Sequence, residues 1–149
     1  MHNDPPKLVA INHDDYHAKH VGTLSDGRQF FLTTPFVPAS RDNLGCEYVA
    51  LFLFDSGGDF IDAKIESLGP RKDLDREHAQ SVYEGILESL GEVAYQRIEV
   101  APFSVEYDGV KMGLILREPE DDDDDWAVEL LPGNFMAFFA PWDSGDYDT

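Results

Sequence analysis

The clearest pattern of apolar and polar positions in this chain lies between Cys46 and Glu66. Residues 48–54 are almost entirely apolar, and residues 60–66 alternate between apolar and charged side chains. Two such runs on either side of a glycine turn predict a β-hairpin, with both Gly57 and Gly58 at the positive φ that such turns require. The first strand is apolar on both faces, so we expect it to be central, and the second lies nearer an edge.

The turn also predicts the register of this hairpin. With Gly57-Gly58 at the centre, Phe54 lies opposite Ile61 and Phe52 lies opposite Ala63, all on one face of the sheet. A slip by one residue would turn charged side chains of the second strand into the core. The register is therefore expected to be well determined.

One long helix is predicted over residues 74–90. Asp73 or Asp75 can cap its start, and Gly91 suits the left-handed position just past its end. Its apolar side chains recur at helical spacing and form one stripe, which is expected to pack on a face of the sheet. The stripe consists of Leu74, Ala79, Val82, Tyr83, Ile86, Leu87 and Leu90.

Short alternating runs separated by turn residues predict further strands. They fall at residues 7–11, 16–24, 28–34, 92–101, 103–107, 110–117, 126–131 and 134–140. Hairpin-length connections indicate a mostly antiparallel, twisted sheet of about seven to nine strands packed against the helix. The prediction is a single α+β domain over residues 1–149, with a polar N-terminal tail at about 1–7 and an acidic loop at 118–125.

Composition excludes several classes of protein. The chain has 149 residues, of which 42% are hydrophobic, enough for a real core in one domain. Its single cysteine, Cys46, excludes an internal disulfide and a zinc site built from several thiolates. It has neither a basic, apolar N-terminal signal nor an apolar run of the roughly 20 residues that span a membrane. These features predict a cytoplasmic location, away from membranes.

The net charge of −19 is concentrated toward the C-terminus, because residues 101–149 contain 13 acidic and two basic side chains. Phosphate-rich partners require clustered Lys and Arg, so this charge argues against nucleic acids and anionic membranes. It allows a basic protein as partner. A solvated acidic surface that serves solubility is the other interpretation.

Residues 13–20 contain three histidines and two carboxylates. His13, His17 and His20 are candidate metal ligands, because imidazole and carboxylate groups bind many transition metals. The spacing differs from the His-Glu-x-x-His pattern of zinc proteases, and on a strand His17 and His20 point to opposite faces. The alternative is a polar strand entry with exposed histidines.

The acidic run and the tryptophan after it are the candidate partner-binding residues. The run contains no glycine to shape a calcium loop and repels itself, so an exposed loop is expected. Its carboxylates would steer a positively charged partner, and the tryptophan would anchor it if exposed. The candidates are Glu118, Glu120, Asp121, Asp122, Asp123, Asp124, Asp125 and Trp126.

The segment 131–141 resembles the late strand-turn-strand of cupin-like small-molecule-binding barrels. That resemblance implies a ligand site in a sheet concavity. In the cupin family, histidines near this segment hold a metal, but here the last histidine is His78, so no metal site is carried over. After this segment, Trp142 and Tyr147 are expected to hold down a polar C-terminal tail.

Two hypotheses of function follow. The first is a non-enzymatic interaction module, similar to an inhibitor or immunity protein, that binds a basic partner by electrostatic steering. The alternative is a small-molecule- or metal-binding domain, with or without enzymatic activity. It would use a pocket in the sheet and the cluster of His13, His17 and His20. The chain contains no nucleophile elbow, phosphate-binding glycine loop or other cofactor signature. Convergence of the three histidines with a carboxylate would favour the alternative.

Overall fold

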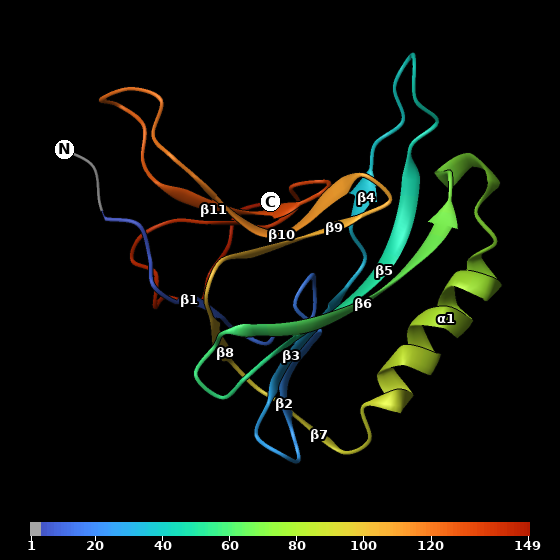
Figure 1. Cartoon of the computed structure of the whole chain (residues 1–149), viewed down its shortest axis with the longest axis horizontal. Coiled ribbons are helices and arrows are strands. Elements are labelled where there is room, and N and C mark those ends of the chain that lie inside the picture. Colours follow the sequence, from blue (N-terminus) through green and yellow to red (C-terminus); the bar gives the residue numbers. More distant parts are fainter. Residues whose placement is uncertain (1–3) are drawn as a thin grey trace.

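The computed structural model describes residues 4–149 and has three layers (Figure 1). A four-stranded sheet packs on one face of a six-stranded sheet, and helix α1 packs on the other. A two-stranded ribbon completes the fold. The predicted α+β class with mostly antiparallel pairing is confirmed, whereas the strands number twelve in three sheets rather than seven to nine in one.

The six-stranded sheet is built around the predicted central hairpin. Its strands run in the order β4-β5-β3-β2-β7, and β6 pairs with the other edge of β5. As expected, the first strand of the hairpin is central and the second is an edge strand. The strands are β2 (His20–Leu24), β3 (Gln29–Thr33), β4 (Phe36–Val37), β5 (Cys46–Phe54), β6 (Phe60–Gly69) and β7 (Val93–Tyr95).

The predicted hairpin register holds along most of the two strands and is wrong next to the turn. Phe52 lies opposite Ala63, but Phe54 lies opposite Phe60 because a β-bulge shifts the register there. The turn is also not the two-glycine turn expected, since only Gly58 has a positive φ (96°). The Asp55 carboxylate accepts two backbone N–H groups within the loop and favours this longer turn.

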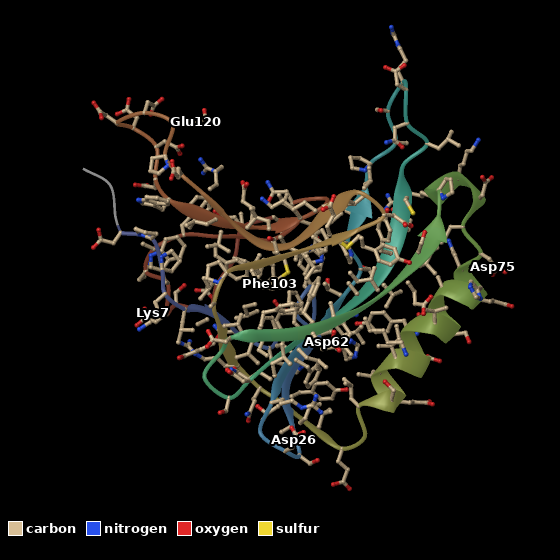
Figure 2. All side chains as sticks on the ribbon, in the orientation of Figure 1. Lys7, Asp26, Asp62, Asp75, Phe103 and Glu120 are labelled. Atoms are coloured by element: carbon tan, nitrogen blue, oxygen red, sulfur yellow. The ribbon has the colours of Figure 1, made fainter. Side chains whose placement is uncertain are left out.

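The four-stranded sheet has the order β12-β11-β10-β9, and the ribbon pairs β1 with β8. All pairs in both are antiparallel. Figure 2 shows Phe103, at the start of β9, directed toward the six-stranded sheet, where its ring stacks on that of Phe60 with centroids 4.6 Å apart. The strands are β1 (Val9–Ile11), β8 (Ile98–Val100), β9 (Phe103–Tyr107), β10 (Val110–Arg117), β11 (Ala127–Leu131) and β12 (Ala137–Phe138).

Helix α1 (Arg76–Ser89) confirms the predicted helix, with ends one or two residues inside the expected range. A 3-10 turn, η1 (Arg71–Asp73), precedes it. Asp75 is the N-cap, and its side chain accepts the backbone N–H of His78. Gly91 has a φ of 73° just past the end, as the sequence predicts. Among residues 4–149, no helix is long and apolar enough to cross a membrane.

The number of layers follows from strands that are apolar on both faces. All five residues of β3 are buried: Phe31 points into the core between the two sheets, and Phe30 and Leu32 point into the core beneath α1. A single sheet under one helix would leave the Phe31 face in water. Burial of each such ring contributes about 1.5–3 kcal/mol, so the remaining strands form a second sheet that covers this face.

Three of the predicted strands have different boundaries in the structure. Residues 16–19 form a turn rather than the start of β2, because the Asp14 carboxylate accepts the backbone N–H groups of Tyr16 and Ala18. The strand expected over 92–101 divides at residues 96–97 into β7 and β8, which join different sheets. The last predicted strand, 134–140, is reduced to β12.

Candidate functional site

The acidic loop, residues 118–125, connects β10 to β11 and extends beyond the sheets, with Glu120 near its outer end (Figures 1 and 2). Arg117 anchors it: Nη1 donates to Asp124 at 2.7 Å, and Nε lies 3.5 Å from Glu129. Asp124 also accepts the backbone N–H of Glu120. The hydrogen bond from Arg117 lowers the pKa of Asp124, and that bond also raises the pKa of Arg117. The loop therefore has a fixed base.

Most carboxylates of the acidic loop face solvent without a cation. Within residues 4–149, five of the 30 acidic side chains lie within 4.0 Å of a cationic nitrogen, and Asp124 is the one that belongs to this loop. Trp126 is half-buried where the loop enters β11, and Leu116 is exposed on β10. The other predicted residues are all exposed: Glu118, Glu120, Asp121, Asp122, Asp123 and Asp125.

The three candidate histidines do not form a ligand set. His13 Nε2 lies 3.0 Å from the carbonyl oxygen of Lys19, and the His17 ring lies 4.9 Å from the ring of Phe135. His20 faces α1 instead. Among the described residues, no group of three or more His, Cys, Asp or Glu side chains is placed to hold a metal ion. The geometry thus removes the support for the metal alternative.

Asp14 belongs to a hydrogen-bonded group that joins the two ends of the chain. Its carboxylate accepts the Tyr147 hydroxyl at 2.5 Å as well as two backbone N–H groups. The Tyr147 oxygen in turn accepts the backbone N–H of His17. Burial raises the pKa of Asp14, but these hydrogen bonds outweigh it and the pKa is lowered. Burial and the bond to Asp14 raise the pKa of Tyr147 to about 12.

The C-terminal tail packs along β1 of its own chain. The backbone N–H groups of Ala10 and Asn12 donate to the carbonyls of Trp142 and Gly145, and Asp148 forms an isolated bridge with Ala137 of β12. Gly145 lies against Asn12 so closely that a Cβ would meet its side chain at 2.3 Å. The Trp142 indole donates to the carbonyl oxygen of Asp4. This contact lies in the predicted polar tail, of which residues 1–3 fall outside the described part.

The cupin-like segment 131–141 includes the end of β11 and the short β12, within the four-stranded sheet. No histidine follows it in the sequence, and the one imidazole whose ring lies against it is His17, on Phe135. Met136 and Phe138 of the segment are buried in the core, whereas Asn134 and Phe139 are exposed. None of its residues lines the two cavities described next.

A concave surface does exist between α1 and the six-stranded sheet. Two adjoining cavities of about 310 and 280 Å³ share Thr34, Gln80 and Tyr83, and we call the two together the α1 groove. The first cavity extends to Tyr16, His17, Lys19, His20, Leu32 and Thr33. The second extends to Glu47, Tyr48, Val49, Leu68, Leu74, Arg76 and Ala79.

His20 and Tyr83 meet inside the α1 groove, where His20 Nδ1 and the Tyr83 hydroxyl form a short hydrogen bond. Burial lowers the pKa of His20, and the nearby charges of Lys19 and His13 lower it further. Burial also raises the pKa of Tyr83. Near neutral pH both groups are therefore uncharged, and they form a neutral polar pair in the wall of the groove.

Sequence reasoning did not identify Arg117 or the His20–Tyr83 pair as parts of a site. For Arg117 a signal was present, since it is the last basic residue in the chain and directly precedes the acidic run. A cation at that position is the obvious partner for the run. His20 and Tyr83 are 63 residues apart, and Tyr83 falls in the apolar stripe of the helix, so no local pattern indicated their contact.

The comparisons with known proteins identify no relative. No protein-family model matches the chain. Neither the curated proteins nor the solved structures contain a significant match to it. A functional conclusion must therefore be based on the geometry described above.

Proposed function

We propose that this protein is a non-enzymatic interaction module of the inhibitor or immunity type, and that its acidic loop binds a basic protein. The observation that carries this proposal is the construction of the loop. Arg117 and Asp124 fix its base at 2.7 Å, and the remaining carboxylates of the loop extend into solvent with no cation within 4.0 Å among residues 4–149.

The loop has the physical properties of a steering surface. Unpaired carboxylates on an extended loop produce a negative potential that raises the rate of encounter with a positive partner by about 10- to 1,000-fold. The loop is already ordered, because the carboxylates of Asp124 and Asp121 accept the backbone N–H groups of Glu120 and Asp123, and the carbonyl of Asp121 accepts that of Asp124. Little further ordering entropy is therefore lost on binding. Leu116 and half-buried Trp126 flank the charges and offer apolar contact area.

The first experiment is a pull-down from native lysate at low and at moderate salt, with the bound proteins identified by mass spectrometry. We expect a basic protein that is retained at low salt and weakened at moderate salt, because exposed charge pairs are screened within about 10 Å at 0.1 M salt. Absence of a specific partner at both salt concentrations would contradict the proposal.

Association kinetics with that partner then locate the steering charges. The variant Asp121→Asn/Asp122→Asn/Asp123→Asn removes three exposed charges and leaves the Arg117–Asp124 anchor in place. We expect its association rate to fall by about three- to tenfold at low salt and to depend less on salt.

The matched control for this variant is Glu77→Gln/Glu84→Gln/Glu88→Gln, which removes the same number of charges from the exposed face of α1. We expect a much smaller change in association rate. Equal effects of the two variants would mean that net charge alone matters, and the acidic loop would have no special role.

A further inference from the structure

The longest strand of the structure, β6, has an open edge. Within residues 4–149 it pairs with β5 and with no other strand, so its outer side presents backbone groups to solvent. Figure 1 shows β6 in the foreground, with α1 on one side of it and the four-stranded sheet on the other. A strand of 10 residues with an unpaired edge is a template for pairing with another chain.

The hydrogen bonds of β5 show which residues of β6 face this open edge. The backbone N–H of Tyr48 donates to Pro35, which lies between β3 and β4. The N–H of Asp55 donates to Asp59 across the β5–β6 turn. Even-numbered residues of β5 therefore bond away from β6, and the residues of β6 opposite them direct their own backbone groups outward. These are Ala63, Ile65 and Ser67, opposite Phe52, Ala50 and Tyr48.

The outward backbone groups have few partners in a single chain. The N–H of Ala63 donates to the Asp62 carboxylate at 2.8 Å, as expected of a group that does not bond to β5. The N–H groups of Ile65 and Ser67 have no acceptor among residues 4–149. A strand that docked on this edge would supply acceptors to all three, and the Asp62 carboxylate would return to solvent.

The charged side chains of β6 suit pairing with a second copy of this chain. Asp62, Lys64 and Glu66 are exposed, and within residues 4–149 none of them lies within 4.0 Å of an opposite charge. When two β6 strands pair antiparallel with Ile65 at the two-fold axis, Lys64 of each copy lies opposite Glu66 of the other. Opposite charges at such positions stabilise a sheet, and this register contains two of these pairs.

The neighbouring registers are less favourable. A two-fold axis at Lys64 would place Lys64 opposite itself and Asp62 opposite Glu66, so that like charges meet throughout. An axis at Ala63 would require pairing by Ile61, which has no partner in the β5 ladder because of the bulge there. A foreign strand of uniform charge would also place a like charge opposite some side chain of β6. The pattern therefore favours a second copy over a strongly basic or acidic strand.

The opposite face of β6 would also gain from such pairing. Ala63 and Ile65 point into the core between the two sheets but are only half-buried, because no strand follows β6. Val105 and Tyr107 of β9 pack against the same core and are half-buried too. A second β6 would cover the open side of this core, with the two Ile65 side chains in contact across the axis, and would remove apolar surface from water.

We propose that β6 is a dimer interface, and that two copies of this chain pair edge to edge and antiparallel with Ile65 at the two-fold axis. The two six-stranded sheets then form one continuous sheet. The backbone groups of Ile65 bond to those of Ile65 in the second copy, and those of Ala63 bond to Ser67. The acidic loop connects strands of the other sheet, so this proposal is independent of the partner proposed for that loop.

Sedimentation equilibrium of the full chain tests the proposal. The buffer should contain about 0.15 M salt, because charges separated by more than about 8 Å are then largely screened and the charge of each chain does not keep the copies apart. We expect a reversible monomer–dimer equilibrium with a Kd of about 1–100 μM. A monomer at all protein concentrations up to about 1 mM would overturn the proposal.

Two charge reversals test the register. Lys64→Glu and Glu66→Lys each bring like charges together in their own dimer, and each should weaken dimerisation about 10-fold or more. In an equimolar mixture, one chain is acidic at both positions and the other is basic at both, so opposite charges meet again. We expect a heterodimer about as stable as the wild-type dimer. A mixture that dimerises no better than the separate variants would contradict the register.

The matched control is Lys111→Glu, which reverses an exposed lysine on β10 of the other sheet. We expect it to change the dimer Kd by less than about twofold. Equal weakening by Lys64→Glu and Lys111→Glu would show a general effect of net charge. A dimer that neither Lys64→Glu nor Glu66→Lys weakens would use another surface. Either result would overturn the proposal.

Amide hydrogen exchange followed by NMR tests the backbone pairing without any substitution. As the protein concentration rises through the dimer Kd, the N–H groups of Ile65 and Ser67 should exchange more slowly. Those of Lys64 and Glu66 face β5 already and should change less. Equal slowing at all four positions, or none at Ile65, would contradict edge-to-edge pairing.

Discussion

The acidic loop and the α1 groove show two opposite ways in which this chain arranges charge. The loop gathers carboxylates on an extended turn and has a cation only at its base, in Arg117. The groove is concave, and its first cavity gathers donors around His20 and Tyr83 with no carboxylate among its lining residues. The net charge of −19 is thus a property of the whole chain, and it does not describe the local surface on which a given partner would act.

The difference also concerns what stabilises each region. Exposed ion pairs contribute about 0.2–1 kcal/mol, so the loop is maintained mainly by its short length and local backbone bonds. The His20–Tyr83 pair of the groove is half-buried between α1 and the sheet, and a polar group that loses its partner in a buried place costs about 1–3 kcal/mol. We therefore expect substitutions in the groove to alter stability more than those in the loop, and three predictions test this expectation.

The largest effect is expected for Tyr83→Phe. This change deletes the hydroxyl that pairs with Nδ1 of His20 and leaves the half-buried ring nitrogen without its partner. The free energy of unfolding should fall by about 1–2 kcal/mol, measured by urea denaturation. The control is Tyr95→Phe, since Tyr95 is 44% exposed and its change should cost less than about 0.5 kcal/mol. Equal losses in the two variants would contradict the structural importance of the His20–Tyr83 bond.

A smaller effect is expected for Arg117→Gln. The pair with Asp124 is partly exposed, with side-chain exposures of 31% and 28%, so solvent screening keeps the loss of unfolding free energy below that of Tyr83→Phe. The local consequence is greater: amide hydrogen exchange in residues 118–125 should become faster, because the base of the loop loses its anchor.

Arg28→Gln is the matched control for Arg117→Gln. Its pair with Asp26 is 2.8 Å long but more exposed, and it links residues only two positions apart. We expect almost no change in stability and none in the exchange of the acidic loop. Unchanged exchange of the loop in Arg117→Gln would show that the loop does not depend on this arginine.

The smallest effect is expected for the pH dependence of stability due to His20. Its pKa in the folded protein lies below the ordinary value of 6.5, so the unfolded chain takes up the proton first as the pH falls. The stabilisation is fully present above pH 6.5 and is lost as the pH falls from there through the folded pKa. The slope from this group stays below about 1.4 kcal/mol per pH unit.

Comparison with His20→Asn isolates this contribution from the other titrating groups. The asparagine carbonyl can still accept the Tyr83 hydrogen but does not titrate. Between pH 7.5 and 5.5, the melting temperature of the wild type should fall more, or rise less, than that of His20→Asn. Parallel pH profiles of the two proteins would mean that His20 has the same pKa in the folded and unfolded states.

The local features of the fold were predictable because they depend on neighbours in the sequence. The alternation after Gly58 gave β6, the apolar stripe gave α1, and Asp75 and Gly91 marked the ends of that helix. In each case a periodicity of two or 3.6 residues, or a side chain that bonds its own backbone, decides the structure. A local bond also explains why the strand predicted from residue 16 does not begin there. The backbone N–H groups of Tyr16 and Ala18 donate to the Asp14 carboxylate and form a turn instead.

The acidic loop was predicted and the α1 groove was not, for the same physical reason. A run of carboxylates is exposed wherever the chain places it, because an unpaired charge is too costly to bury. The groove brings His20 of β2 into contact with Tyr83 of α1, and this contact depends on how α1 lies across the sheet. Local patterns in the sequence predicted α1, the central hairpin, the acidic loop and most of the strands. Packing between residues far apart in the sequence is responsible for the three sheets, for the docking of the C-terminal tail on its own chain and for a cavity without lining carboxylates, so these features were not predictable.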